Sequence, residues 1–550
     1  MARPRDSPTR KEILQALHAV DVDEIELLFD ELWYDLPDRF APEVLAALVG
    51  LPPVVVEQRP RLTDLALLAH RRATYDVDDG SGLARMLELA TRAGLRYGNR
   101  LGTFSRMPDL VAAGTASVMA HRYRRSYDVS ERLGAWVDAR VVQSSPRSVL
   151  PWGATETRFR PGWLSLQRGI TAMLGGAVDP AVKLFDRART EAGDEPHAHY
   201  AGLLAAAHLA LLSAFHGHFE LARDWLRGSS SSVPVPAWIG GSDAGVGAVV
   251  RAQIAVEEGD PESALGWLRA VRRSSDLVEL WPFLAFTRAA FQAHYGDPVR
   301  GLRELDEARL AHGTVDADPA TLTGRLLLRA EAKLLLRTGG GVGRVLRFAH
   351  DHDDVPWLAA SHAWAHLTVG EHHEAVRLAS SSLQGSARSS AEVIDLHVVL
   401  AVAHLRSGRE DRARTWFQSA VRLRASPRHI APFLSMHRDE LETLTRLAGV
   451  PSLLRGGAVE IGHNPPAPVA SVRLSPRERE VLQALGEGHT AESAAKKSGV
   501  AITTVRTQIR KIYEKLGAAN RREALATAQE LGLLDANRAP GLRRARVRNG

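Results

Sequence analysis

A recurring glycine is the feature of this sequence that most restricts its fold. Between residues 160 and 425 an apolar helical stretch repeatedly ends at a glycine, and a small residue follows five positions later. Successive glycines lie 31 to 43 residues apart, which is the length of one helix–turn–helix unit. Glycine accepts the left-handed backbone that ends a helix, and the small residue lets the next helix pack closely. The pairs are Gly176 with Ala181, Gly217 with Ala222, Gly259 with Ala264, Gly296 with Gly301, Gly370 with Ala375 and Gly408 with Ala413, and Gly339 is the weakest member.

The pattern resembles tetratricopeptide repeats, in which helical hairpins stack into a solenoid. The resemblance covers about half of the chain and concerns architecture only, because the period drifts and the full tryptophan-to-proline signature is missing. Residues 1–150 are also helical in pattern, with stretches around Ile13–Leu36 and Leu83–Leu101, and are expected to extend the array. Val54–Val56, flanked by prolines, is the one strand-like cluster there. We expect an all-α fold with a tetratricopeptide-like α-solenoid over residues 1–455.

The positive charge of the chain is concentrated at its C-terminal end. The net charge is +6 over 550 residues, yet residues 471–550 hold 16 Lys and Arg against 8 Asp and Glu, which leaves −2 for residues 1–470. A basic segment on a near-neutral body favours an anionic partner such as nucleic acid. A Gly- and Pro-rich stretch, residues 456–472, suits a semi-extended linker. We expect a basic tail over 534–550 that either adds phosphate contacts or has no function.

A second motif starts at Leu474, where the chain reads LSPREREVLQALGEGHTAESAAKKSGVAITTVRTQIRKIYEKLGAANRREALATA. Ser475, Pro476 and Glu478 predict a capped helix start, after which apolar residues face a core. Over about 60 residues this segment resembles the LuxR/GerE-type helix-turn-helix. The resemblance rests on Arg477 to Leu482, Gly488, Ala495, Val500, Thr504 to Arg506, Ile512, Lys515 and Leu516. It implies a four-helix domain over residues 473–533 that binds double-stranded DNA.

The third helix of this segment is expected to read the DNA. Val505, Ile509, Ile512 and Leu516 define its buried stripe, which leaves the opposite face for a ligand. Arginine can donate two hydrogen bonds to guanine, and threonine can contact a thymine methyl group. The resemblance makes Arg506, Thr507 and Arg510 the candidate base contacts. Thr503, Thr504 and Lys511 are the candidate phosphate contacts.

The fourth helix is expected to pair two copies of the chain. Asn520 to Glu523 predicts a capped start. In the LuxR family this helix forms a dimer, and two half-sites on the DNA follow from that symmetry. The candidate dimerisation residues are Ala524, Leu525, Ala528 and Leu531. The segment departs from the common family pattern at Ser493, Ala494, Ala501 and Gln508, which affects site preference more than the fold; Thr503 could shift the start of the third helix in place of the missing cap at Ala501.

No catalytic, cofactor or metal site is expected. The chain has no cysteine, which excludes disulfides, Cys-ligated zinc and thiol catalysis. It has no Gly-Lys pair, so it lacks the P-loop ATPase module of large LuxR-type regulators. His362 and His366 lie one helical turn apart but have no zinc-motif partners, and packing is the simpler interpretation. We therefore expect that the protein is not an enzyme.

The combined prediction is a LuxR-type transcriptional regulator in which the helical repeats bind an unknown protein or small-molecule effector. The first ten residues are polar and no uncharged apolar run approaches about 18 residues, so we expect a cytoplasmic protein without membrane contact. One alternative is a protein-interaction scaffold with a drifted helix-turn-helix that no longer binds DNA. A sigma-factor-like promoter reader is a third interpretation, and no core-polymerase-binding region accompanies it.

Overall fold

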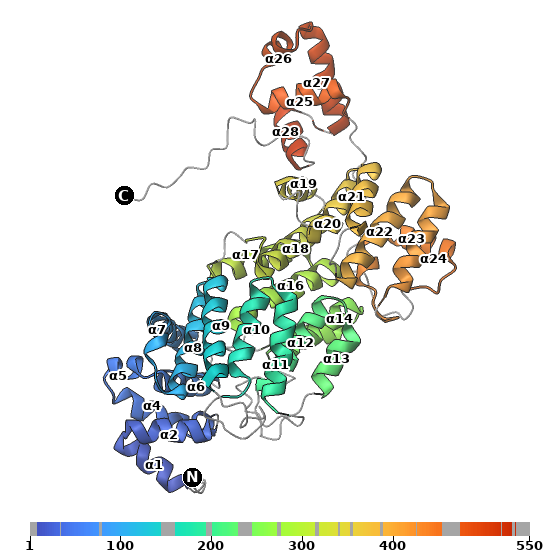
Figure 1. Cartoon of the computed structure of the whole chain (residues 1–550). Coiled ribbons are helices and arrows are strands. Elements are labelled where there is room, and N and C mark those ends of the chain that lie inside the picture. The colour runs from blue at the N-terminus through green and yellow to red at the C-terminus, as the bar shows by residue number, and fades with distance from the viewer. Residues whose placement is uncertain are drawn as a thin grey trace. The chain divides into compact units, whose positions relative to one another are not determined.

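The computed structural model of this chain is helical in all of its described elements (Figure 1). It describes residues 8–33, 35–75, 80–144, 160–193, 201–228, 245–271, 277–313, 318–338, 341–351, 356–384, 389–424, 426–453, 474–516, 518, 520–530 and 534. It falls into two compact units, the first made of residues 1–255, 262–284 and 317–326, and the second of 256–261, 285–316 and 327–550. Within the described ranges no helix has both the length and the apolar character needed to cross a membrane. The predicted all-α fold is confirmed.

The first unit contains a series of helices that pack against their neighbours in sequence, as α8, α9, α10 and α11 do in Figure 1. Its helices are α1 (Arg10–Ala19), α2 (Val22–Leu32), α3 (Asp35–Arg39), α4 (Ala41–Val49), α5 (Pro53–Gln58), α6 (Pro60–Tyr75), α7 (Gly80–Gly98), η1 (Leu101–Thr103), α8 (Met107–Tyr123), α9 (Tyr127–Ser144), α10 (Trp163–Leu174), α11 (Val178–Glu191), α12 (Ala201–Phe215) and α13 (Phe219–Gly228). Four helices have residues in both units: α14 (Val246–Glu257), α15 (Pro261–Ala270), α16 (Leu277–Tyr295) and α18 (Leu322–Arg337).

The second unit continues with helices of similar length and ends with the four helices of the predicted helix-turn-helix. Its remaining elements are α17 (Pro298–Ala311), α19 (Val342–Asp351), η4 (Pro356–Leu358), α20 (Ala359–Thr368), α21 (His372–Gln384), α22 (Ser390–Arg406), α23 (Glu410–Arg422), η5 (Ala431–Ser435), α24 (Arg438–Ala448), α25 (Pro476–Gly486), α26 (Ala491–Ser498), α27 (Ile502–Leu516) and α28 (Arg521–Glu530). The predicted linker over 456–472 lies outside the described residues, as does the tail apart from Leu534.

The predicted glycine turns connect consecutive helices. The small residue that follows each glycine is buried in the next helix, where it permits close packing. The glycines with left-handed backbone have φ between +70° and +91°, and they are Gly176, Gly217, Gly259, Gly370 and Gly408. The buried alanines after them are Ala181, Ala222, Ala264, Ala375 and Ala413. Both halves of the pattern therefore have the physical role that the sequence predicted.

Gly296 departs from the pattern, because its φ is outside the left-handed region. The turn is completed by Asp297, whose carboxylate accepts a hydrogen bond from Val299 N at 2.9 Å and caps α17. Gly301 still has the predicted packing role. A Cβ atom at Gly301 would lie 2.6 Å from Leu334 Cδ2 and 2.8 Å from Gln292 Cβ, so a larger residue would force these neighbours to shift. Gly339 lies outside the described residues.

The strand-like cluster Val54–Val56 is helical, and the composition was misleading there. Pro53 occupies the first position of α5, where the backbone N–H that proline lacks would have no partner within the helix. Val56 is buried. Packing of the short α5 against α6 therefore outweighs the preference of valine for strands. The stretch around Ile13–Leu36 is divided into α1, α2 and the start of α3.

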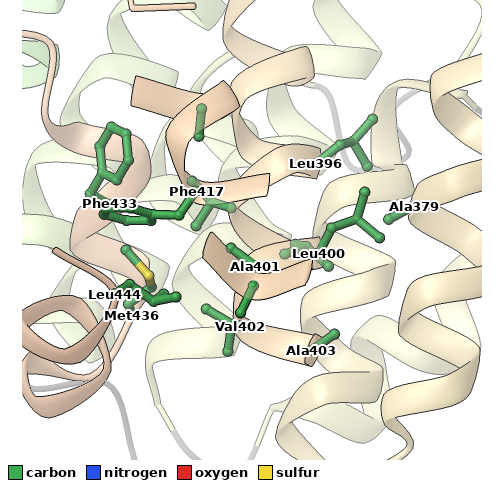
Figure 2. Close-up of a cluster of buried hydrophobic side chains, with 14 of the residues drawn as sticks. Ala379, Leu396, Leu400, Ala401, Val402, Ala403, Phe417, Phe433, Met436 and Leu444 are labelled. Carbon is green, nitrogen blue, oxygen red and sulfur yellow. The ribbon is translucent and has the colours of Figure 1, made fainter. Parts of the chain in front are cut away.

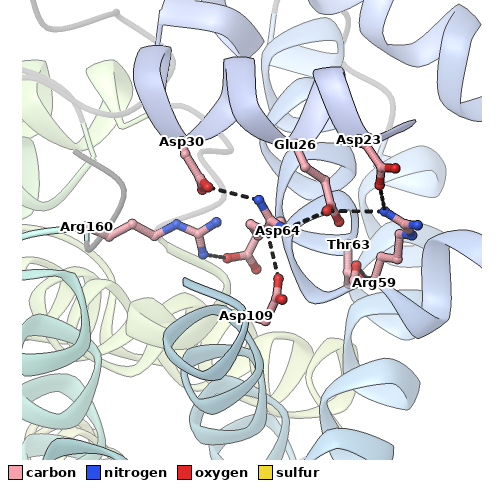
Figure 3. A network of polar contacts seen from close by, with 9 residues as sticks. Asp23, Glu26, Asp30, Arg59, Thr63, Asp64, Asp109 and Arg160 are labelled. Atoms are coloured by element: carbon pink, nitrogen blue, oxygen red, sulfur yellow. Dashed lines mark hydrogen bonds and ion pairs between the residues drawn. The ribbon is translucent and has the colours of Figure 1, made fainter. Parts of the chain in front are cut away.

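A network of buried charges holds the first helices of the first unit together (Figure 3). Arg61 on α6 has only 1% of its side chain exposed and donates hydrogen bonds to Glu26 and Asp30 on α2 and to Asp109 on α8, at 2.6, 2.9 and 2.7 Å. Beside it Arg160 pairs with Asp64. Burial raises the pKa values of Glu26 and Asp30. The network fixes three helices through directional contacts, which apolar packing alone does not provide.

The core of the second unit centres on α22, which begins at a capping box between Ser389 and Glu392. Figure 2 shows Leu396, Leu400 and the neighbouring small residues of α22 among side chains from the helices around it. Phe417 of α23 and Phe433 of η5 meet edge to face there, with ring centres 5.6 Å apart. A helix that is apolar on nearly all sides must be covered on nearly all sides, and α21, α23 and α24 cover it.

Candidate nucleic-acid interface

The helices α25, α26, α27 and α28 form a small bundle around α27, which packs against the other three. The predicted stripe of α27 is confirmed, since three of its members are buried and Ile509 packs against the same core half-buried. The buried core residues are Leu474, Val481, Leu482, Ala484, Leu485, Ala494, Ala495, Val505, Ile512, Leu516, Ala524, Ala528 and Leu534. One face of α27 is therefore committed to folding, and the opposite face is free for a ligand.

The start of α25 forms the predicted capping box. Ser475 Oγ accepts a hydrogen bond from Glu478 N at 3.2 Å, and Glu478 Oε2 accepts one from Ser475 N at 2.7 Å. The same carboxylate, with only 6% of its side chain exposed, accepts a hydrogen bond from Lys515 Nζ at 2.6 Å. The hydrogen bond from Lys515 lowers the pKa of Glu478. Lys515 therefore fastens the end of α27 to the start of α25.

The turn between α26 and α27 determines which residues the recognition helix presents. Gly499 ends α26 with φ +65°. Helix α27 then begins at Ile502, directly after Ala501, whose carbonyl accepts hydrogen bonds from Thr504 N and Val505 N. Thr503 therefore does not shift the helix start, and Thr503 and Thr504 lie in the first turn. Ala501 has no side-chain oxygen to cap the helix, as the departure from the family pattern implied.

All six candidate contact residues lie on the exposed part of α27. At about 100° per residue, Thr503, Thr507 and Arg510 share one line along the helix. Thr504 and Lys511 lie on one side of that line, and Arg506 lies on the other side. The fold thus gathers two arginines, three threonines and a lysine on one exposed side of a single helix. The major groove of DNA is wide enough to admit such a helix.

The two arginines of this surface are held only loosely. Arg506 Nη2 lies 3.9 Å from Glu492 Oε1 of α26, and Arg510 Nε lies 3.8 Å from Glu514 Oε1 one turn on, with 65% and 74% of the arginine side chains exposed. Exposed pairs of this kind contribute about 0–1 kcal/mol. Both guanidinium groups can therefore exchange these carboxylates for base or phosphate acceptors at little cost.

Thr507 has its hydroxyl committed within the helix. Thr507 Oγ1 donates to the carbonyl oxygen of Thr503 at 2.9 Å. This bond uses the hydroxyl proton and leaves the methyl group at the exposed surface, where it can contact the methyl group of a thymine. Thr503 contributes its backbone to this bond and has its own hydroxyl in the first turn of the helix, near the end that favours phosphate.

The candidate dimerisation residues are distributed differently. Ala524 and Ala528 of α28 are buried in the core of the domain itself, and Leu525 packs against the same core half-buried. Leu531 lies outside the described residues. The predicted cap of α28 is present in part, since Asn520 Oδ1 accepts a hydrogen bond from Glu523 N at 3.0 Å. The two alanines therefore hold α28 in place within the domain.

Comparison with known proteins agrees with this geometry. Residues 472–528 match the family described as bacterial regulatory proteins, luxR family. The HTH-type transcriptional regulator MalT of Vibrio campbellii is 30% identical over 200 residues, which cover 31% of this chain and 22% of that protein. The probable transcriptional regulatory protein NarL of Mycobacterium tuberculosis is 46% identical over 85 residues, covering 16% of this chain and 38% of that protein.

The matches cover only part of this chain and only part of each relative. The chain spans less than two fifths of the length of either relative. The segment matched in MalT is longer than the luxR family match, so it includes residues outside the four-helix bundle. The family match, the buried stripe of α27 and the polar face opposite to it all concern the same four helices. Residues 472–528 are therefore a DNA-binding helix-turn-helix domain of the luxR family of bacterial regulatory proteins.

Proposed function

We propose that the whole chain is a transcriptional regulator in which the helical repeats over residues 1–455 control DNA binding by the domain over 473–533. The observation that carries this proposal is the exposed face of α27, which presents basic and hydroxyl side chains opposite a buried apolar stripe. MalT and NarL, two of the proteins that this chain matches, are named as transcriptional regulators. In the same proposal, residues 456–472 form the linker between the two regions and residues 534–550 form a basic tail. The regulator would act on bacterial DNA in the cytoplasm.

In this proposal Arg506, Thr507 and Arg510 contact bases in the major groove. Both arginine side chains are largely exposed, and each can donate a bidentate pair of hydrogen bonds to guanine O6 and N7. Thr507 contributes its methyl group, because its hydroxyl proton is used inside the helix. These three residues would determine which sequence is preferred.

Thr503, Thr504 and Lys511 contact phosphates in the same proposal. The threonines lie in the first turn of α27, where unpaired backbone N–H groups and the helix dipole favour an anion. Lys511 lies on the same side of the helix as Thr504, one and a half to two turns further along. Such contacts fix the orientation of a recognition helix without reading sequence.

Two copies would bind one operator, with the outer face of α28 as the contact between them. An effector, either a protein or a small molecule, would bind the repeats and change the DNA affinity by linkage, since it binds one state of the regulator more tightly than the other. The expected DNA site is a two-fold symmetric pair of half-sites.

The test is an in vitro selection of DNA bound by the full-length protein, followed by salt titration of the selected site. The informative variant is Arg506→Ala with Arg510→Ala. The matched control is Arg303→Ala with Arg438→Ala, which removes two exposed arginines on α17 and α24 that form i,i+4 pairs with glutamate, as Arg510 does. We expect a two-fold motif with the wild type and the control, and none with the variant.

Three results would overturn parts of the proposal. Equal enrichment by the variant and the wild type would remove the base-contact assignment. Binding without sequence preference would remove specific readout and leave phosphate contacts alone. Absence of salt-dependent DNA binding would favour the scaffold with a drifted helix-turn-helix.

A further inference from the structure

A cavity of about 70 Å³ lies within the second unit, in the repeat region rather than in the DNA-binding domain. Its walls come from α16, α18, α20 and α22, from the last residue of η5 and from His437 at the start of α24. By the same measure one water molecule needs about 10–15 Å³, so the cavity has room for a carboxylate or a phosphate group. What distinguishes it from a packing defect is the chemistry of its walls.

Arg337 contributes a buried positive charge to this cavity. Only 9% of the residue is exposed. Its Nε donates to the carbonyl oxygen of Ala293 at 2.8 Å and its Nη2 to that of Leu434 at 2.9 Å, while Nη1 is buried without a hydrogen-bond partner. In the described part of the chain no carboxylate pairs with this guanidinium. Burial lowers the pKa of Arg337 to about 10, so it remains charged at neutral pH.

His294 adds a second donor without an acceptor. The Nζ atom of Lys333 lies 3.3 Å from Nε2 of His294. An ammonium group only donates, so Nε2 accepts and the ring proton of the neutral imidazole is on Nδ1. That Nδ1 atom is also buried without a hydrogen-bond partner. Burial lowers the pKa of His294 well below its ordinary value, and Lys333 and Arg337 lower it further, so the ring is neutral at pH 7.

The remaining charged groups of the cavity do not neutralise this excess of donors. Arg406 is paired with Glu440 at 2.6 Å. Asp395 is the acidic residue of the wall, and burial raises its pKa to about 6 although Lys333 opposes this shift. Asp395 and the buried Glu257 both attract the ammonium group of Lys333, whereas Arg337 has no such carboxylate partner among the described residues. Buried donors and buried charge without acceptors are costly, which implies a partner that brings acceptors and negative charge.

We propose that this cavity binds the anionic group of a small molecule, a carboxylate or a phosphate, and that this molecule is the effector of the regulator. Arg337 Nη1 and His294 Nδ1 donate hydrogen bonds to the anion, and Lys333 supplies the second positive charge. The half-buried ring of Trp364 in the same wall provides an apolar surface for the rest of the molecule. The assignment as an effector rests on the proposed function, whereas the binding of an anion does not.

The test is calorimetric titration of the full-length protein with acetate, pyruvate and inorganic phosphate at constant ionic strength, with acetamide as the uncharged counterpart of acetate. We expect binding of at least one anion and none of acetamide. Binding of the carboxylates without phosphate identifies an organic acid as the source of the anion, and the reverse identifies a phosphate compound.

Two variants locate the binding. Lys333→Met is expected to weaken binding of the anion about tenfold or more, and Arg337→Met is expected to abolish it. Each variant removes a charge-assisted contact. The control is Arg344→Met, which removes an exposed arginine that pairs with Glu331 on α18. If Arg337→Met fails to fold by circular dichroism, Ser361→Asp replaces it, since a carboxylate in the cavity wall repels the anion.

The proposal is overturned if none of the three anions binds, if acetamide binds as well as acetate, or if the cavity variants bind the anion as tightly as the control. Arg506→Ala with Arg510→Ala must retain anion binding, which shows that the anion is not held by the DNA surface. DNA selection by the same preparations tests the proposed function separately. Anion binding without DNA binding would contradict the proposed function alone, and DNA binding without anion binding would contradict the cavity alone.

Discussion

The arginines of the first unit and those of the recognition helix have opposite roles. Arg61 is buried and donates to three carboxylates from two other helices at normal hydrogen-bond distances. Arg506 and Arg510 are largely exposed, and each lies 3.8 to 3.9 Å from a single carboxylate. A buried arginine whose partners are complete stabilises a fold, because losing either side leaves an uncompensated charge. An exposed arginine with a weak partner remains available for a ligand.

The largest expected effect is on the buried side of this comparison. Arg61→Met leaves Glu26, Asp30 and Asp109 without their common partner, so we expect the free energy of unfolding to fall by about 3–5 kcal/mol. Chemical denaturation followed by circular dichroism measures this. The control is Arg39→Met, an exposed arginine of the same unit that pairs one turn away with Asp35 and should cost less than about 1 kcal/mol. Similar losses in both variants would show that the Arg61 network is not a stabilising feature.

A second buried polar group, His208, is expected to make the stability of the first unit depend on pH. Burial lowers the pKa of His208 to about 4, and its Nδ1 hydrogen-bonds the carbonyl oxygen of Leu204 at 2.8 Å. The unfolded chain takes up this proton near pH 6.5 and the folded chain only near pH 4. Stability is therefore complete above pH 6.5 and falls by about 3 kcal/mol as the pH decreases to 4.

His208→Gln removes this proton from both states. Denaturation at pH 7 and at pH 4.5 should therefore show a smaller loss of stability in the variant than in the wild type. An equal loss in the two proteins would mean that other groups cause the acid sensitivity of the first unit.

Substitution of the exposed arginines of α27 is expected to change DNA affinity and to leave stability nearly unchanged. Arg506→Ala and Arg510→Ala should each cost about 1–3 kcal/mol on the selected site and change the free energy of unfolding by less than about 0.5 kcal/mol. Fluorescence anisotropy with labelled DNA, together with denaturation of the same proteins, measures both quantities. A loss of stability without a loss of DNA affinity would mean that these arginines stabilise the fold, as Arg61 does, and do not contact DNA.

The smallest expected effect separates the methyl group of Thr507 from its hydroxyl. Thr507→Ser removes the methyl group and should weaken the specific site by about 0.8 kcal/mol, the contribution of one buried methyl or methylene group. Thr507→Val keeps the methyl group and removes only a hydroxyl whose proton is used inside the helix. We expect the valine variant to bind like the wild type in the same anisotropy titration. The reverse order of the two variants would assign the hydroxyl, not the methyl group, to the DNA.

Features that depend on neighbouring residues could be predicted from the sequence. The glycine turns, the alanines that follow them, the capping box at Ser475 and the buried stripe of α27 are all set by contacts within a few residues or one helical turn. The all-α prediction is confirmed, and the structure differs from the local pattern only in details that a nearby contact decides. Asp297 caps α17 although Gly296 lacks the left-handed backbone, and the packing of α5 makes Val54–Val56 helical.

The all-helical character of the chain, the position of the helix-turn-helix and the residues that its third helix exposes follow from the order of the residues alone, because helical periodicity and capping are local. Long-range packing is what buries Arg61 and leaves Arg506 exposed, and it brings Lys333 and Arg337 to one cavity with His294 from another helix. The arginine side chain has the same chemistry at positions 61, 337 and 506, and its helical neighbours in the sequence are similar. Its burial and its partners come from segments that lie 31 to 48 residues away in the case of Arg61, and only folding brings these segments together.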